Sequence, residues 1–160
     1  NLGLLARAFD AMRAEQPGLR LVVVGDGPER EAFLARCPGA IMAGARSGVD
    51  LAEHYASADM FLFPSLTETY GNVTPEAMAS GLAVLAFDYA AGAELIRHGD
   101  NGLLAPFGDE DAFVRRATDL ASQPLLADRL RQGARESTLA LDWSHIVRQV
   151  EDVWLRMLKV

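Results

Sequence analysis

Residues 59–88 contain two short apolar runs separated by a polar loop and a helix pattern, and this order constrains the fold more than any other feature. The apolar runs cover residues 60–63 and 82–87. Between them, Thr74-Pro75 is a typical helix start and Ser80-Gly81 is a typical helix end. A strand, a loop, a helix and a second strand in so short a segment predict a β-α-β unit of an open parallel sheet.

The rest of the sequence repeats this alternation. Further apolar runs at residues 19–24, 40–43 and 103–104 predict three more strands, and helical spacing between the runs predicts the connecting helices. The run at 19–24 is apolar apart from Arg20 and rich in β-branched residues, as in strands that are buried on both faces. Five strands alternating with helices predict a doubly wound α/β domain with a Rossmann-like parallel sheet and C-terminal helices.

The chain opens on a helix pattern, which stops at Pro17-Gly18. An α/β domain of this kind should open on a strand instead. We therefore expect that residues 1–160 form one domain that is truncated at its N-terminus, and that its first strand lies upstream.

The sequence after Asp109 is helical throughout. Its last helix carries a long apolar stripe from Trp143 to Met157, and Asp142 is placed to cap it. We expect this stripe to pack on the domain's own core, with docking on another domain as the alternative.

The composition limits the possible binding partners and the cellular compartment of the protein. A net charge of −7 argues against binding to nucleic acid, and no apolar run approaches the length of about 20 residues that spans a membrane. The single Cys37 allows no internal disulfide and favours a reducing compartment such as the cytoplasm. His54, His98 and His145 are scattered, so we expect no metal site.

The loop before Thr74 is suited to a phosphate. Ligands of open parallel sheets bind at the carboxyl ends of the strands, and a helix start there presents free N–H groups and a positive dipole end. Because Pro75 has no N–H, the donors would be Gly71, Asn72, Val73 and Thr74. Gly71 permits the close backbone approach that such a contact needs.

Glu68 and Glu76 flank this loop with seven residues between them. Phosphate would repel an ionised Glu76, so we expect Glu76 to accept from neutral hydroxyls such as a ribose diol. Glu68 stands between two threonines and suits a hydroxyl-rich partner such as a sugar. The alternatives are that Glu76 only stabilises the helix start and that Glu68 is a solvated loop residue.

Gly25 and Gly27 follow the apolar run at 19–24 and suggest a turn with close backbone approach. The segment fails as a dinucleotide fingerprint, because Arg30 stands where the third glycine should be. A tight turn without a ligand and a binding loop both remain open.

Several spaced motifs together resemble the group 1 (family four) retaining glycosyltransferases, which have the GT-B fold of two Rossmann-like domains. The segment from Glu68 to Glu76 resembles their E-x7-E signature. Residues 24–28 resemble their G-x-G-P turn, residues 58–65 their A-D…P-S approach, and residues 95–104 their E-x-I…G-x-N-G-L-L segment.

The resemblance implies that the chain is the C-terminal, donor-binding half of a GT-B fold, which holds a UDP- or GDP-linked sugar without a metal or other cofactor. Glu68 would contact the donor sugar as the catalytic residue, and Glu76 would contact the ribose. The amides of residues 71–74 would meet the sugar and the pyrophosphate, with Gly25 and Gly27 at a second turn of the donor site and Arg46 near the base. A hexose would pass, with retention, to a glycan or lipid acceptor on the N-terminal domain.

Two departures from the family pattern affect these expectations. Ala90-Ala91 stand where many members have paired glycines, and the basic residues that grip the pyrophosphate would lie upstream of residue 1. We therefore expect the isolated chain to be inactive. We also expect the missing upstream strand to be the central strand of the complete sheet. Exposed strand edges would then favour a homo-oligomer of the fragment. We expect a cytoplasmic protein, or one held at the inner membrane face through the N-terminal domain.

Other functions remain open. A sugar-nucleotide epimerase uses the same fold, and a glycoside hydrolase also uses paired carboxylates, set across one glycosidic bond about 5–9.5 Å apart. A non-catalytic nucleotide-binding module is the third alternative.

Overall fold

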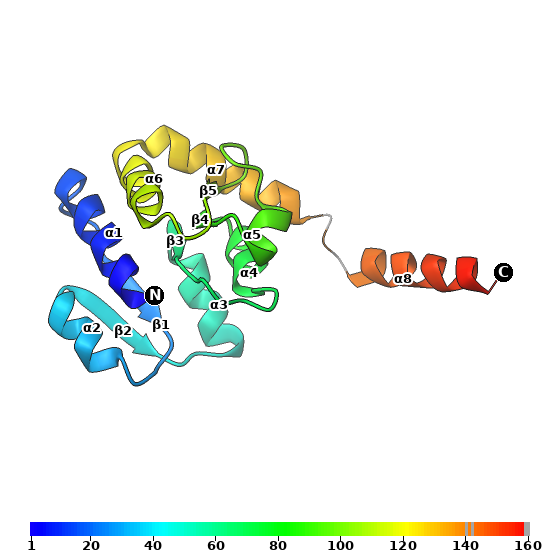
Figure 1. Ribbon diagram of the computed structural model, residues 1–160, viewed down its shortest axis with the longest axis horizontal. Coiled ribbons are helices and arrows are strands. Elements are labelled where there is room, and N and C mark those ends of the chain that lie inside the picture. Colours follow the sequence, from blue (N-terminus) through cyan, green and yellow to red (C-terminus); the bar gives the residue numbers. More distant parts are fainter. Residues whose placement is uncertain (140, 142, 159–160) are drawn as a thin grey trace.

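The computed structural model describes residues 1–139, 141 and 143–158 and places five parallel strands in two separate sheets (Figure 1). The smaller sheet pairs β1 with β2, and the larger has the order β3-β4-β5. The strands cover Leu21–Val24 (β1), Ala40–Gly44 (β2), Met60–Phe63 (β3), Ala83–Phe87 (β4) and Leu103–Ala105 (β5).

Helices connect successive strands and then extend the chain beyond β5. They cover Leu2–Glu15 (α1), Arg30–Arg36 (α2), Gly48–Ala56 (α3), Val73–Ala79 (α4), Ala90–Leu95 (α5), Glu110–Ser122 (α6), Pro124–Thr138 (α7) and Trp143–Met157 (α8). The alternation confirms the predicted doubly wound, Rossmann-like α/β class. No helix in the described part of the chain is both long and apolar enough to cross a bilayer.

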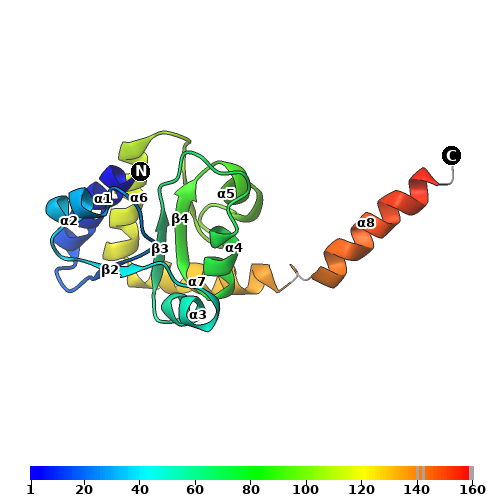
Figure 2. The same ribbon diagram turned by 90° about the horizontal axis from the view of Figure 1, so that it is seen from below.

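Strand β4 is the centre of the core, because all five of its residues are buried. Ala83, Leu85 and Phe87 face the cluster formed with α1, α6 and α7. Val84 and Ala86 point to the opposite cluster, formed with α4 and the end of α7. Figure 2 shows these helices on the two faces of the larger sheet. The uninterrupted apolar run at 82–87 is therefore explained by a strand that is covered on both faces.

The two sheets are not hydrogen-bonded to each other. Among the described residues β1 pairs only with β2, and β3 pairs only with β4, so each sheet has an open edge. A cavity of about 1740 Å³, here called the inter-sheet cavity, is lined by β1 on one side and by β3 on the other. This arrangement fits the Rossmann-like order, in which one further strand would stand between β1 and β3.

Helix α4 begins earlier than predicted. Asn72, not Thr74, occupies the N-cap position, and its side chain makes no capping hydrogen bond. Thr74 lies in the first turn with its side chain buried, and its N–H donates to the Gly71 carbonyl at 3.0 Å. The positive φ of Gly71, +93°, reverses the chain just before this point and so starts the helix sooner.

The prediction that α8 packs on the domain's own core is wrong in this structure. Helix α8 projects away from the sheets (Figures 1 and 2), and Val150, Trp154 and Met157 on its apolar stripe are exposed. Helices α6 and α7 already pack against the apolar core of the larger sheet. The predicted cap, Asp142, lies outside the described residues.

Asn101 holds the turn before β5 to the surrounding helices. It is fully buried, its Oδ1 accepts from the Arg97 N–H at 2.6 Å, and its Nδ2 donates to the Leu95 carbonyl and to Ser137 Oγ, both at 3.0 Å. We expect Asn101→Ala to lower the free energy of unfolding by about 2–4 kcal/mol, because it leaves buried partners unsatisfied. Urea denaturation measures this loss.

The matched control is Asn72→Ala, because the Asn72 side chain is exposed and makes no capping hydrogen bond. We expect that variant to unfold within about 0.5 kcal/mol of the wild type. Equal losses in the two variants would contradict the role given to Asn101.

Candidate functional site

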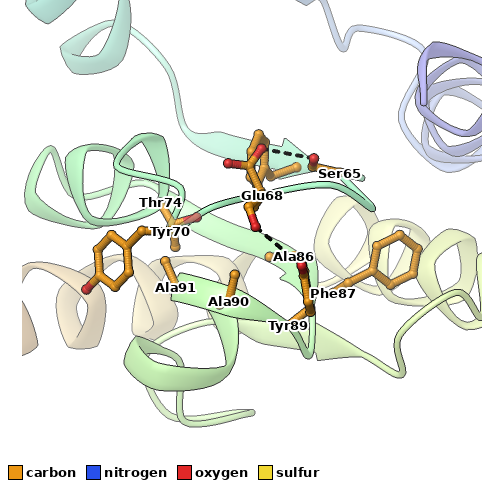
Figure 3. Close-up of a pocket in the computed structure, with 11 residues that line it drawn as sticks. Ser65, Glu68, Tyr70, Thr74, Ala86, Phe87, Tyr89, Ala90 and Ala91 are labelled. Carbon is orange, nitrogen blue, oxygen red and sulfur yellow. Dashed lines mark hydrogen bonds between the residues drawn. The ribbon is translucent and has the colours of Figure 1, made fainter.

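A small cavity lies at the carboxyl ends of β3 and β4, where ligands of parallel sheets bind. We call it the Glu68 cavity (Figure 3). Its walls come from the Glu68 loop (residues 64–72), from the end of β4, and from the Tyr89 turn (residues 88–91). Its volume of about 10 Å³ would hold about one water molecule. A sugar would therefore lie at the mouth of this cavity or displace the loop.

The Glu68 carboxylate is held by its own loop. Its Oε1 accepts a hydrogen bond from Ser65 Oγ at 3.0 Å (Figure 3). The carboxylate also packs against Gly71. A Cβ added at Gly71 would lie 3.3 Å from Glu68 Oε2, and the φ of Gly71 is positive. The positive φ therefore favours glycine at position 71, and an added Cβ would crowd the Glu68 carboxylate.

Three backbone amides at the start of α4 have no partner in the described part of the chain: those of Gly71, Asn72 and Val73. The fourth predicted donor, the amide of Thr74, is already bonded to Gly71 within the turn. Thr74 contributes to the Glu68 cavity through its side chain instead. Three adjacent N–H groups beside a carboxylate can bind an anion and a neutral hydroxyl at the same time.

Glu76 lines the inter-sheet cavity, whereas Glu68 lines the smaller one. The two cavities share Phe63 and Ser65 at the end of β3, so they adjoin each other. The Tyr55 hydroxyl, on α3, donates to Glu76 Oε2 at 3.1 Å. Burial raises the pKa of Tyr55, and the neighbouring Glu76 carboxylate raises it further. Tyr55 thus remains a neutral donor to a charged acceptor.

Two of the three other predicted donor-binding residues line the inter-sheet cavity. Gly25 lines it with a φ of +136°, and its N–H donates to the Gly44 carbonyl at 2.8 Å. Arg46 lines it too, paired with Asp50 at 3.0 Å. Gly27 is exposed and lines neither cavity, and its N–H donates to Asp26 Oδ1 at 2.9 Å. The structure therefore groups Gly25, Arg46 and Glu76, but not Gly27.

No group of three or more histidine, cysteine, aspartate or glutamate side chains converges on one point within the described ranges. His98 serves the turn before β5, where its Nδ1 accepts from the Leu104 N–H at 3.0 Å. Burial, together with the positive charge of Arg116, lowers the pKa of His98, so its neutral, accepting form is favoured.

Tyr55 and Tyr89 were not among the site residues that the sequence predicted. Each makes its contact with a residue 21 positions along the chain, Tyr55 with Glu76 and Tyr89 with Glu68. Tyr55 was visible in the sequence only as part of an apolar helix face. No short motif contains either pair, so local pattern could not indicate them.

The tie between Tyr55 and Glu76 predicts a dependence of stability on pH. The pKa of Tyr55 is raised above its ordinary value of 10.0, so the folded protein holds the phenolic proton more tightly than the unfolded chain does. This contribution is complete below pH 10 and is lost as the pH rises above it. We expect Tyr55→Phe to show a shallower loss of stability than the wild type as the pH rises above about 10, measured by urea denaturation.

Tyr70→Phe is the control for this experiment, because it removes a phenol and leaves the contact between Tyr55 and Glu76 in place. We expect it to retain the wild-type slope. A Tyr55→Phe variant with the wild-type slope would show that Tyr55 does not stabilise the fold through its proton.

The sequence profile of the family described as "Glycosyl transferases group 1" matches residues 1–123. A GDP-mannose-dependent alpha-mannosyltransferase of Mycobacterium tuberculosis is 40% identical over 132 residues, which are 81% of this chain and 34% of that protein. The chain thus spans about a third of the length of that relative.

Solved structures have the same fold. The pneumococcal O-GlcNAc transferase GtfA, solved with UDP and GlcNAc, superposes with a TM-score of 0.81 at 21% identity, covering 99% of this chain and 33% of its own. The C-terminal domain of a group 1 glycosyltransferase (LpcC) from Francisella tularensis gives a TM-score of 0.76 at 21% identity, covering 86% and 76%.

The fold is therefore that of the C-terminal domain of GT-B glycosyltransferases, as the sequence predicted. The profile match covers most of the 160 residues and includes both glutamates, their loop and the strands around them. The chain belongs to the group 1 glycosyltransferase family.

Proposed function

We propose that this chain is the donor-binding domain of a retaining glycosyltransferase that transfers a hexose from a UDP- or GDP-sugar to a glycan or lipid acceptor. One observation carries the proposal: three amides without a partner among the described residues lie between Glu68 and Glu76 in the sequence, and these two carboxylates line adjoining cavities. Each part of a nucleotide sugar then has a matching group.

The pyrophosphate is assigned to the amides of Gly71, Asn72 and Val73, since N–H groups at a helix start favour anions. The ribose is assigned to Glu76, in the inter-sheet cavity with Gly25 and Arg46. The donor sugar is assigned to Glu68, whose carboxylate is acceptor-only and suits hydroxyl groups. No metal enters this assignment, because N–H dipoles can stabilise the leaving phosphate charge.

The separation of the two carboxylates supports transfer over hydrolysis. A glycoside hydrolase sets both carboxylates across a single glycosidic bond. Here Glu68 and Glu76 line different cavities, and Glu76 accepts a hydrogen bond from Tyr55, which lines the inter-sheet cavity with it. Two carboxylates in separate spaces can contact different parts of one extended ligand.

We also propose that the domain is completed by polypeptide upstream of α1, which would supply a strand between β1 and β3. The open edges of the two sheets and the cavity between them support this proposal. The acceptor domain, the cytoplasmic or membrane-peripheral location, and self-association of the isolated chain remain predictions.

A panel of nucleotide sugars tests the function. We expect the full-length protein to be stabilised by a GDP-sugar or a UDP-sugar, and we put GDP-mannose first because the M. tuberculosis relative is named for it. A ligand at 100 times its Kd should add about 2.7 kcal/mol to the free energy of unfolding, measured by thermal denaturation.

The bare nucleotides are the comparison for this panel. A donor site should bind the nucleotide sugar and the nucleoside diphosphate with different affinities, because Glu68 meets only the sugar. Equal affinities would favour a nucleotide-binding module, and no response to any member of the panel would contradict the proposal.

A further inference from the structure

The Glu68 loop is attached to the Tyr89 turn beneath it by two hydrogen bonds. The Tyr89 hydroxyl donates to the Glu68 carbonyl at 3.3 Å (Figure 3). The Ala91 N–H donates to the Tyr70 carbonyl at 2.9 Å. Both bonds end on the main chain of the loop, at Glu68 itself and two residues after it. The height of the Glu68 carboxylate above β4 therefore depends on this turn.

The backbone of the Tyr89 turn is held in an uncommon conformation. Ala90 has a φ of +48° and is the one non-glycine residue with a positive φ among those that the structure describes. Such a conformation persists where its surroundings enforce it, and it is found most often at functional sites. Here it comes directly before the Ala91 N–H that bonds to the Tyr70 carbonyl.

Gly92, directly after the Tyr89 turn, packs closely against the end of β4. A Cβ added at Gly92 would lie 2.6 Å from the Phe87 carbonyl, so the chain after Ala90 runs against the end of β4. The Tyr89 N–H also donates to that carbonyl, at 2.8 Å. The turn is thus fixed to the central strand of the larger sheet, which is the most buried element of the core.

The ring of Tyr89 is supported from outside the cavity. Phe107 packs against it with ring centroids 4.8 Å apart, and Phe107 itself meets Phe87 edge-on at 6.2 Å. On its other side, Tyr89 lines the Glu68 cavity. The contact with Phe107 on one side leaves the Tyr89 hydroxyl on the side of the cavity, where it donates to the Glu68 carbonyl.

We propose that Tyr89 is a positioning residue that sets the Glu68 carboxylate for the sugar part of the donor. This inference rests on the proposed function, because it takes Glu68 as the sugar contact. Tyr89 acts through the main chain of the loop and lies away from Glu76 and Arg46, which line the other cavity. Loss of its hydroxyl should therefore weaken recognition of the sugar and leave recognition of the nucleotide unchanged.

The test compares the affinities of the full-length protein for GDP-mannose and for GDP, or for the matching pair of the nucleotide that it prefers, by isothermal titration calorimetry. We expect Tyr89→Phe, which keeps the ring, to reduce the affinity for the nucleotide sugar by about three- to tenfold. The affinity for the nucleoside diphosphate should stay at the wild-type value.

Ser122→Ala is the control. Ser122 is exposed on α6, lines neither cavity, and donates its hydroxyl only to carbonyls of its own helix. We expect both affinities of this variant to remain unchanged. A melting temperature measured for each variant without ligand separates a change at the site from a loss of folded protein.

The outcomes are distinct. A wild-type protein that binds neither ligand, or binds both equally, would overturn the proposed function and the role of Tyr89 with it. Sugar-specific binding that Tyr89→Phe leaves intact would overturn the role of Tyr89 alone. An equal loss of both affinities would also overturn it, because it would make Tyr89 a general support of the domain.

Discussion

Replacing Glu68 with glutamine is expected to lower kcat/KM for sugar transfer by about 10- to 100-fold. A hydrogen bond to a charged group contributes about 1.5–3 kcal/mol, and each 1.36 kcal/mol is about a factor of ten in rate. Glutamine keeps the shape of the side chain and can still accept from Ser65 Oγ, so the loop should keep its position. Initial rates of the full-length protein with its preferred donor measure the loss.

Two further variants test whether the loss of rate is specific to Glu68. Glu31→Gln removes an exposed carboxylate on α2, away from both cavities, and should keep the wild-type rate. Glu76→Gln should lower the affinity for the nucleotide sugar and for the nucleoside diphosphate by the same factor, because it alters the proposed ribose contact. Wild-type activity in Glu68→Gln would show that Glu68 is not part of the site. An equal loss of affinity for the nucleotide sugar and for the nucleoside diphosphate would show that Glu68 contacts the nucleotide instead of the sugar.

Strand β4 and the Glu68 loop could be predicted because the information for them is local. Residues 82–87 form one apolar run, and Ala83–Phe87 within it is buried on both faces. Thr74-Pro75 marked the start of α4 to within two residues. The spacing of Glu68 and Glu76 identified both as candidates. The spacing could not show that they line different cavities, because this depends on how α3 and β3 pack.

The position of α8 could not be predicted for a related reason. An amphipathic stripe records that a helix needs an apolar partner, but not which surface supplies it. Leu120 and Leu130, on α6 and α7, already fill the core beside the larger sheet. The contacts of Tyr55 and Tyr89 were missed likewise, since each joins residues that are distant in sequence and brought together only by the fold.

Adding the proposed upstream strand is expected to raise the free energy of unfolding of the domain by several kcal/mol. A strand of four to five residues between β1 and β3 would satisfy two open edges, with about 1 kcal/mol net for each new hydrogen bond. It would also cover the apolar walls of the inter-sheet cavity, among them Val23 and Leu62. Ordering the new residues costs about 1–2 kcal/mol each, so the net gain is smaller than the gross one. Urea denaturation of residues 1–160 with and without the extension measures the difference.

Proline at the centre of the added strand provides the control, because it removes a ladder hydrogen bond without shortening the chain. We expect it to cancel most of the gain. Light scattering gives a second readout: the open edges of residues 1–160 should drive self-association, and the extended domain should be monomeric. An extension that adds no stability, or that tolerates proline without loss, would show that the space between β1 and β3 is not filled by that strand. The two sheets would then have to be bridged by another segment.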